Sequence, residues 1–142
     1  TDFLVSRLGV TGNIEDEREC KLALRRWLSR RCHDSLVTWL RDVSRETGLP
    51  FGRAMVKMQR TRWASCSRHK TISLNLKLLF LQPALVRYVF IHELCHTVHM
   101  NHSRKYWRFL MAKEPNCMAL DKQLRTAWRL VPAWLGAGGT EL

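Results

Sequence analysis

Apolar side chains recur every three or four positions from Asn13 to Glu46, which is the period of an amphipathic helix. This pattern predicts one long helix, or two helices joined near residues 31–34. The apolar positions are Leu24, Trp27 or Leu28, Leu36, Val37, Leu40 and Val43. Asn13 is followed by acidic residues, as is typical of a helix N-terminus, and Gly48 and Pro50 predict where the helix ends.

Beyond Pro50 the chain alternates between apolar and polar positions, which is the period of a β-strand. Residues 53–59 and 71–76 show this alternation, residues 63–67 can form a second strand between them, and a polar turn lies at 68–70. We therefore predict a three-stranded antiparallel meander. One side of this sheet is expected to be basic, and its cationic residues are Arg53, Lys57, Arg60, Arg62, Arg68 and Lys70.

The rest of the chain carries helix start signals. Asn75 can cap a short helix that runs through Leu81, and Pro83 fits the first turn of the next helix. Ser103 and Asn116 can cap two C-terminal helices. A helix, a small sheet and then further helices give an α+β fold.

The length of 142 residues predicts a single domain over residues 1–142. Residues 1–12 are interpreted as a remnant N-terminal strand, because the chain begins at Thr rather than Met. Residues 136–142 are glycine-rich and are expected to form a frayed tail.

The segment His92-Glu93-Leu94-Cys95-His96 has the HExxH pattern. Two histidines four positions apart lie on one face of a helix, so both imidazoles can bind one ion at about 2.0–2.1 Å. Glu93 then lies where it can contact a water on the metal without being a ligand. The other faces of this helix are apolar, so it is expected to be buried. A metal would remove the cost of burying these polar groups.

The residues leave several candidates for a third metal ligand. His99 shares the face, but it lies seven residues beyond the first histidine, about 10.5 Å along a helix axis. His102 can reach the ion if the helix stops near Met100 and Asn101 turns the chain in a left-handed conformation. We favour His102, with His99 or a downstream carboxylate as alternatives. The carboxylates considered are Glu114 and Asp121.

Charge and cysteine content bear on partners and location. The formal net charge of +12 favours anionic partners such as nucleic acid, although a solvated basic surface explains it equally well. The five cysteines are an odd number, and no signal peptide or membrane-spanning apolar run is visible. These features predict a cytoplasmic protein with free thiols and no membrane association.

Several motifs in combination are more specific than HExxH alone. They are Arg62-Trp63-Ala64-Ser65-Cys66-Ser67, Ile72-Ser73-Leu74-Asn75, Pro83, Tyr88-Val89, His92-Glu93-Leu94-Cys95-His96, Asn101-His102-Ser103 and Tyr106-Trp107. Together they resemble the YgjP-like metallopeptidase family, which is related to the SprT and WLM zinc proteases. The resemblance is strong over about residues 50 to 110. Ala64 stands where the family usually has glycine, and Tyr106 where it often has phenylalanine.

The resemblance implies a zincin-like fold in which His92, His96 and His102 hold zinc. It also implies that Glu93 acts as general base toward a zinc-bound water, which makes the chain a zinc metallopeptidase acting on a peptide or protein. Two further residues are candidates for substrate binding. Arg62 is a candidate to hold a substrate carboxylate or phosphate, and Tyr88 to donate a hydrogen bond to the oxyanion.

Two alternative functions keep the zinc. One is hydrolysis of a phosphoanhydride such as a nucleotide, for which a basic surface is also suitable. The other is a basic nucleic-acid-binding domain with structural zinc. That alternative predicts a closed site with a fourth protein ligand, for example Cys66 or His99.

Overall fold

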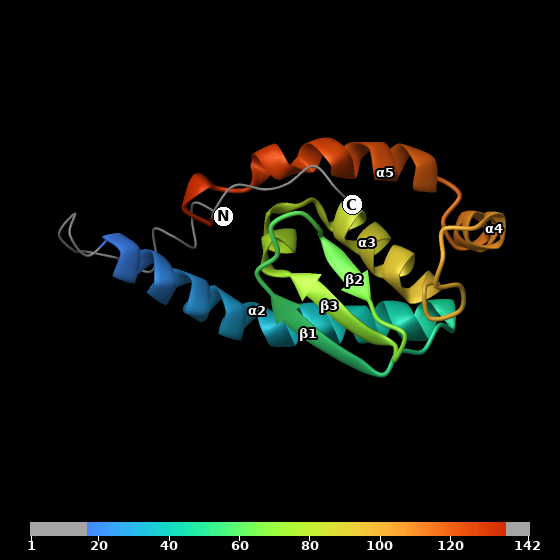
Figure 1. Ribbon diagram of the computed structural model, residues 1–142, viewed down its shortest axis with the longest axis horizontal. Helices are drawn as coiled ribbons and strands as arrows, with labels where there is room; N and C mark the ends of the chain where they lie inside the picture. Colours follow the sequence, from blue (N-terminus) through green and yellow to red (C-terminus); the bar gives the residue numbers. More distant parts are fainter. Residues whose placement is uncertain (1–16, 136–142) are drawn as a thin grey trace.

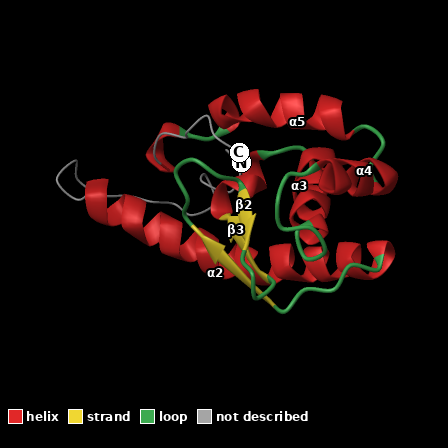
Figure 2. Ribbon diagram, turned by 45° about the vertical axis from the view of Figure 1, so that its right-hand side comes forward, coloured by secondary structure: helices red, strands yellow, loops and turns green. Residues whose placement is uncertain are grey.

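The computed structural model describes residues 17–135, which form an α+β arrangement with helices around a small sheet (Figures 1 and 2). Helix α3 lies between α2 on one side and α5 on the other. In chain order the elements are α2 (Glu17–Thr47), β1 (Arg53–Lys57), β2 (Ala64–Cys66), β3 (Thr71–Asn75), the 3₁₀-helix η2 (Leu76–Phe80), α3 (Pro83–Cys95), α4 (Arg104–Lys113), α5 (Cys117–Thr126), and the 3₁₀-helices η3 (Ala127–Leu130) and η4 (Ala133–Leu135).

Helix α2 is continuous, so of the two arrangements expected from the sequence the single long helix is the observed one. Its buried residues are Leu24, Leu28, Cys32, Leu36, Val37, Leu40 and Val43. The helix ends in a Schellman motif, with Gly48 in the left-handed region at φ 70°. The Gly48 amide donates to the Arg45 carbonyl (3.4 Å), and the Leu49 amide donates to the Ser44 carbonyl (3.1 Å).

The sheet differs from the predicted antiparallel meander. Its strand order is β1-β3-β2, with β3 in the centre and both other strands at an edge. Strand β1 runs parallel to β3, with Val56 opposite Leu74, whereas β2 runs antiparallel to β3, with Ser65 opposite Ser73. The predicted strand positions are confirmed, but the order and the direction of β1 were wrong.

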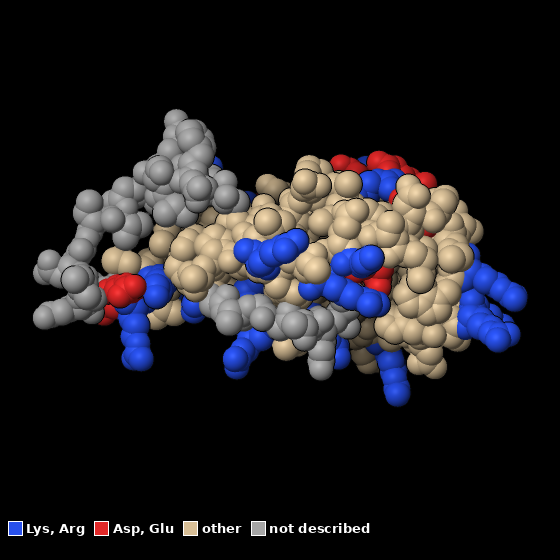
Figure 3. All heavy atoms as spheres, turned by 90° about the horizontal axis from the view of Figure 1, so that it is seen from above, with Lys and Arg blue, Asp and Glu red and all other residues tan. Residues whose placement is uncertain are grey.

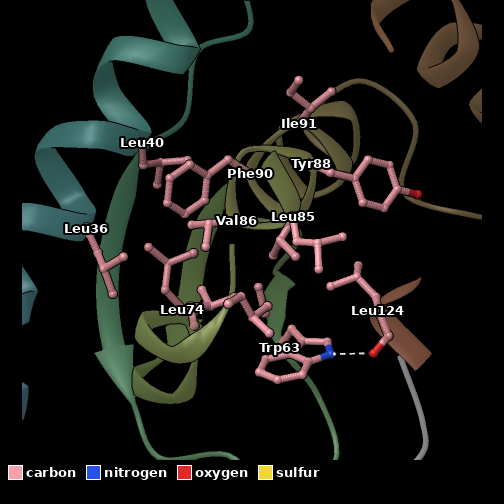
Figure 4. Close-up of a cluster of buried hydrophobic side chains, with 14 of the residues drawn as sticks. Leu36, Leu40, Trp63, Leu74, Leu85, Val86, Tyr88, Phe90, Ile91 and Leu124 are labelled. Carbon is pink, nitrogen blue, oxygen red and sulfur yellow. Dashed lines mark hydrogen bonds between the residues drawn. The ribbon is translucent and has the colours of Figure 1, made fainter. Parts of the chain in front are cut away.

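The connection between β1 and β2 explains this order. It carries the chain past β3 and is held at its far end by Trp63, which is buried. The Trp63 ring stacks on Trp128 with 3.8 Å between ring centroids. Its Nε1 donates to the Leu124 carbonyl at 3.2 Å, as Figure 4 shows. These partners lie about sixty residues further along the chain, so the alternation pattern of the strands contains no signal for them.

Helix α3 is the centre of the core. Phe90, Ile91 and Leu94 are fully buried, whereas Pro83 and Ala84 at the start of the helix are exposed and Arg87 and His92 are partly exposed. Figure 4 shows α3 side chains packed among residues of α2, the sheet and α5, such as Leu40 and Leu124. The expectation of a buried metal-motif helix is therefore confirmed.

Helix α3 ends earlier, and by a different route, than predicted. Its last residue is Cys95, and the next three amides tighten the chain by bonding to carbonyls three residues back. The predicted left-handed turn at Asn101 is wrong, because Lys70 is the one non-glycine residue with positive φ among residues 17–135. A 3₁₀-type end needs no left-handed residue.

The predicted caps at Asn75 and Ser103 are confirmed. Asn75 accepts from the Lys77 amide at 3.1 Å, and Ser103 accepts from the Tyr106 amide at 3.3 Å. Asn116 stands at the start of α5 but makes no side-chain cap bond.

No helix within residues 17–135 is both long and apolar enough to cross a membrane. The predicted strand at 1–12 and tail at 136–142 lie outside the described residues, and the single-domain assignment stays a prediction.

Asn75 also fixes the loop before β2, so its loss should destabilise the protein. The fully buried side chain donates from Nδ2 to the carbonyls of Gln59 (3.0 Å) and Arg62 (2.8 Å). Asn75→Ala leaves these carbonyls unpaired, and we expect a loss of about 2–4 kcal/mol in the free energy of unfolding, measured by urea denaturation. Asn101→Ala is the matched control, since Asn101 is exposed. Equal stability of the two variants would contradict this role of Asn75.

Candidate metal centre

Three histidine side chains meet between the end of α3 and the start of α4. His92 lies in the last turn of α3, His96 directly follows that helix, and His102 precedes Ser103, the cap of α4. Each offers one ring nitrogen, and the three nitrogens lie within 4.8 Å of one another. Within residues 17–135, no other His, Cys, Asp or Glu joins this group.

The spacing of the three rings suits a single ion. The Nε2 atoms of His96 and His102 are 3.0 Å apart. This is close to the roughly 3.3 Å that separates two ligands of a tetrahedral ion bound at about 2.0–2.1 Å. The His92 ring centroid lies 5.3 Å from that of His96 and 5.5 Å from that of His102. The donor set, three imidazole nitrogens, is one that zinc commonly binds.

Neighbouring groups favour the neutral, metal-binding form of His96 and His102. The His99 carbonyl lies 3.0 Å from His96 Nδ1. This contact places the His96 proton on Nδ1, where it is donated to the carbonyl, and leaves Nε2 free to bind a metal. Burial lowers the pKa of His96. Partial burial and the neighbouring His96 and His92 lower the pKa of His102, so both rings favour the neutral form that coordinates metal.

Tyr106 contacts two of the three histidines, His92 and His96. It is fully buried, and its ring stacks on His96 at 4.4 Å between centroids and 15° between planes. Its hydroxyl donates to the His92 carbonyl at 2.9 Å. Burial and the nearby Glu93 raise the pKa of Tyr106, so the hydroxyl remains a donor. Tyr106 therefore links the first turn of α4 to the last turn of α3.

Glu93 is buried beside the histidines. Its Oε1 lies 3.4 Å from His92 Nδ1. Its Oε2 is buried and has no hydrogen-bond partner among the described residues. An unpaired buried carboxylate oxygen is costly, and a water shared with a bound metal would supply the missing partner. The residues present therefore fit a metal with a water beside Glu93.

A pocket of about 210 Å³ opens onto this group. It is lined by Arg62, Ala64, Ser65, Cys66, His92, Glu93, His96, Met100 and His102. These residues come mainly from the edge strand β2 and from the end of α3. The pocket therefore places a strand edge beside the candidate metal ligands.

Of the two candidate substrate-binding residues, Arg62 and Tyr88, the structure places only one in the lining of this pocket. Arg62 lines the pocket. Tyr88 is 1% exposed and does not line the pocket. Its hydroxyl donates instead to Asp121 Oδ1 at 3.1 Å.

The structure does not bring the other candidate ligands into the histidine group. The ring of His99 packs against Phe109 instead, with 5.4 Å between centroids. Glu114 pairs with Arg87 at 3.9 Å, and Asp121 is the acceptor for Tyr88. Cys66 lines the pocket, but burial and the nearby Glu93 raise the pKa of its thiol to about 11, which disfavours a thiolate ligand.

Sequence reasoning missed Tyr106 and Met100 as parts of the site. Tyr106 follows His102 by four residues, with the Ser103 cap between them, so helical spacing was an available signal for its approach to the histidines. Met100 lines the pocket from the turn after α3, and a turn of this kind has no periodic signal.

The surface around this fold is strongly basic. Figure 3 shows Lys and Arg side chains at several separate places on a face formed mostly by other residues, and Asp and Glu in only a few small patches. The basic residues expected on the sheet are likewise exposed, for example Arg53, Arg62 and Arg68. With a formal net charge of +12, the protein has a field that attracts anions.

Two solved structures share this fold. The metallopeptidase zymogen of Pyrococcus abyssi abylysin is 21% identical, with a TM-score of 0.58 over 66% of this chain and 95% of that chain. The metallopeptidase zymogen of Methanocaldococcus jannaschii jannalysin is 20% identical, with a TM-score of 0.53 over 63% of this chain and 92% of that chain. These similarities confirm the predicted α+β, zincin-like fold. A search among curated proteins finds none that matches the chain.

The sequence profile of the YgjP-like family, described as a metallopeptidase domain, matches residues 6–127. Nothing in these similarities supports the nucleic-acid partner that the net charge suggested. A metallopeptidase acts on peptides or proteins, and this one is expected to use zinc, which the three histidines are positioned to bind. The chain therefore belongs to the YgjP-like family of metallopeptidases.

Proposed function

We propose that this protein is a zinc-dependent peptidase in which His92, His96 and His102 hold the metal and Glu93 is the general base. The observation that carries this proposal is the group of three ring nitrogens within 4.8 Å, beside a buried carboxylate with an unpaired oxygen. Three protein ligands leave a fourth position for water, as in catalytic rather than structural zinc sites.

The chemistry follows from the positions of these groups. Zinc, when bound, would polarise the substrate carbonyl and bring the pKa of a water ligand towards neutrality. Glu93 accepts the proton of the water that attacks the peptide carbonyl. The same carboxyl then delivers that proton to the leaving amine, so the carboxylate is regenerated. The buried position of Glu93 keeps it oriented toward the pocket side of α3.

Strand β2 is the candidate binding edge for the peptide. It is an edge strand of the sheet, and its three residues, Ala64, Ser65 and Cys66, line the pocket. An extended peptide can add to such an edge through backbone hydrogen bonds, which requires no particular side chain in the substrate. This arrangement would lay the scissile bond beside the three histidines.

Metal removal tests the proposed activity. We expect the zinc-loaded protein to cleave members of a fluorogenic peptide library, because zinc and Glu93 together supply the attacking water. Incubation with 1,10-phenanthroline should reduce cleavage by at least about 100-fold, and added zinc should restore it, whereas magnesium should not. Cleavage that persists without metal, or no cleavage of any member by protein carrying one zinc per chain, would contradict the proposal.

A further inference from the structure

We infer that Arg62 binds a carboxylate of the substrate, so that the enzyme selects acidic peptides. This inference rests on the proposed peptidase function and deepens it. Arg62 lines the same pocket as the three histidines and Glu93, and it lies two residues before β2. A peptide laid along β2 would therefore pass its guanidinium.

The backbone at Arg62 is fixed in place. The Arg62 carbonyl accepts a hydrogen bond from Asn75 Nδ2 at 2.8 Å, and Asn75 is fully buried. The next residue, Trp63, is 2% exposed and accepts at its carbonyl from the Asn75 amide at 2.9 Å. A side chain on a backbone held by hydrogen bonds loses less conformational entropy on binding than one on a mobile loop.

The guanidinium itself is available. Arg62 is exposed and makes no ion pair or side-chain hydrogen bond with any residue of the described part of the chain. By contrast, Arg87 and Arg125 each pair with a carboxylate, Glu46 and Asp121 respectively. An arginine that lines the pocket, has a fixed backbone and is unpaired among the described residues is suited to bidentate recognition of a planar carboxylate.

The charges of the pocket point to the same class of substrate. Glu93 is the one carboxylate among the lining residues, and it is buried next to the candidate metal ligands. A bound dication with neutral histidines would leave the pocket with a net positive charge. An acidic group on the substrate would be attracted to this pocket, whereas a lysine near Arg62 would be repelled.

The carboxylate has two chemical sources, an Asp or Glu side chain or the C-terminus of a peptide. Either would form the same pair of hydrogen bonds with Arg62. Because the site is partly exposed, we expect a preference of about tenfold rather than a larger one.

The test compares cleavage rates across matched peptide pools. Eight-residue pools with blocked termini carry Glu, Gln or Lys at one fixed position, which is scanned along the peptide. We expect kcat/KM for the best Glu pool to exceed that of the matching Gln pool about tenfold in the wild type. The ratio should fall to about one in Arg62→Gln, and the order of Glu and Lys should invert in Arg62→Glu. Arg60→Gln is the control, since Arg60 is an exposed neighbour that does not line the pocket.

A second set of pools separates the two sources. These pools contain no acidic side chain and end in either a free carboxylate or an amide. A preference for the free carboxylate that disappears in Arg62→Gln would assign the contact to the peptide C-terminus. A preference confined to the Glu pools would assign it to a side chain. Equal cleavage of all pools by the wild type, or a preference that survives in Arg62→Gln, would overturn the inference.

Binding measured without turnover separates failure of this inference from failure of the proposed function. Fluorescein-labelled Glu and Gln pools are titrated with the zinc-loaded Glu93→Gln variant, with and without Arg62→Gln, and fluorescence anisotropy is recorded. Tighter binding of Glu pools that requires Arg62 supports the inference even if the wild type cleaves nothing. Equal binding of Glu and Gln pools overturns it even if the wild type is an active peptidase.

Discussion

Replacing Glu93 with Gln should nearly abolish peptide cleavage while leaving zinc bound. The carboxamide has the same size as the carboxylate but cannot accept a proton from water. General-base catalysis typically contributes a factor of about 10²–10⁴, and we expect kcat to fall within that range. The substitution should be tolerated structurally, because the Glu93 side chain is 8% exposed and its Oε2 has no partner among the described residues.

Zinc content and turnover should be measured on the same preparation of Glu93→Gln. Glu19→Gln is the matched control, because Glu19 lies in the exposed first turn of α2. If Glu93→Gln keeps wild-type turnover, Glu93 is not the base. If it loses zinc along with activity, the carboxylate helps to hold the metal, and the proposed division of roles is wrong.

The second large effect is expected at His102. His102→Ala should remove one of three metal ligands, so zinc affinity should fall by more than the roughly 10–100-fold that loss of a hydrogen-bond partner of a ligand costs. His99→Ala should keep wild-type zinc affinity. The contribution of His99 to the site is its backbone carbonyl, which accepts from His96 Nδ1 at 3.0 Å and survives the substitution.

Competition with a coloured chelator gives the zinc affinity of both variants, and circular dichroism shows whether each is folded. The pair is a sharp comparison because the two histidines are three residues apart and both were candidates for the third ligand. Wild-type affinity in His102→Ala, or loss of zinc in His99→Ala, would reverse the assignment.

The helices of this protein were predictable because their signals are local. The period of apolar positions predicted α2, and Gly48 and Ser103 act within a single turn of the helices that they end or begin. The same holds for His92 and His96, because helix geometry alone puts residues four apart on one face. None of these inferences needs information from elsewhere in the chain.

The strand order could not be predicted, because it depends on distant contacts. Alternation shows which side chains share a face of the sheet, but it is the same for parallel and antiparallel pairing. The observed order places β3 between β1 and β2, and Trp63 holds the connection against Trp128 and Leu124. A sequence without an alignment carries no signal for such a pairing.

The histidine site could be predicted in part: its residues were found from the sequence, but the turn that brings them together was not. Sequence reasoning favoured His102, and the structure does bring it to His96 and His92, but the turn that does so is not the one expected. The chain tightens directly after Cys95, and the His99 carbonyl meets His96 Nδ1, so Asn101 needs no left-handed conformation. Tyr88 lies one turn before His92, which made it a candidate donor to the oxyanion, but its hydroxyl donates to Asp121.

The stacked pair Trp63 and Trp128 has a consequence for the smallest folding unit of this protein. The family match ends at residue 127, one position before Trp128. Trp128 nonetheless supplies one ring of the stack that anchors Trp63, the residue directly before β2, and β2 lines the pocket. Contacts that hold β2 in place therefore extend past the family match, and we expect a shortened chain to keep β2 well ordered only if it includes η3.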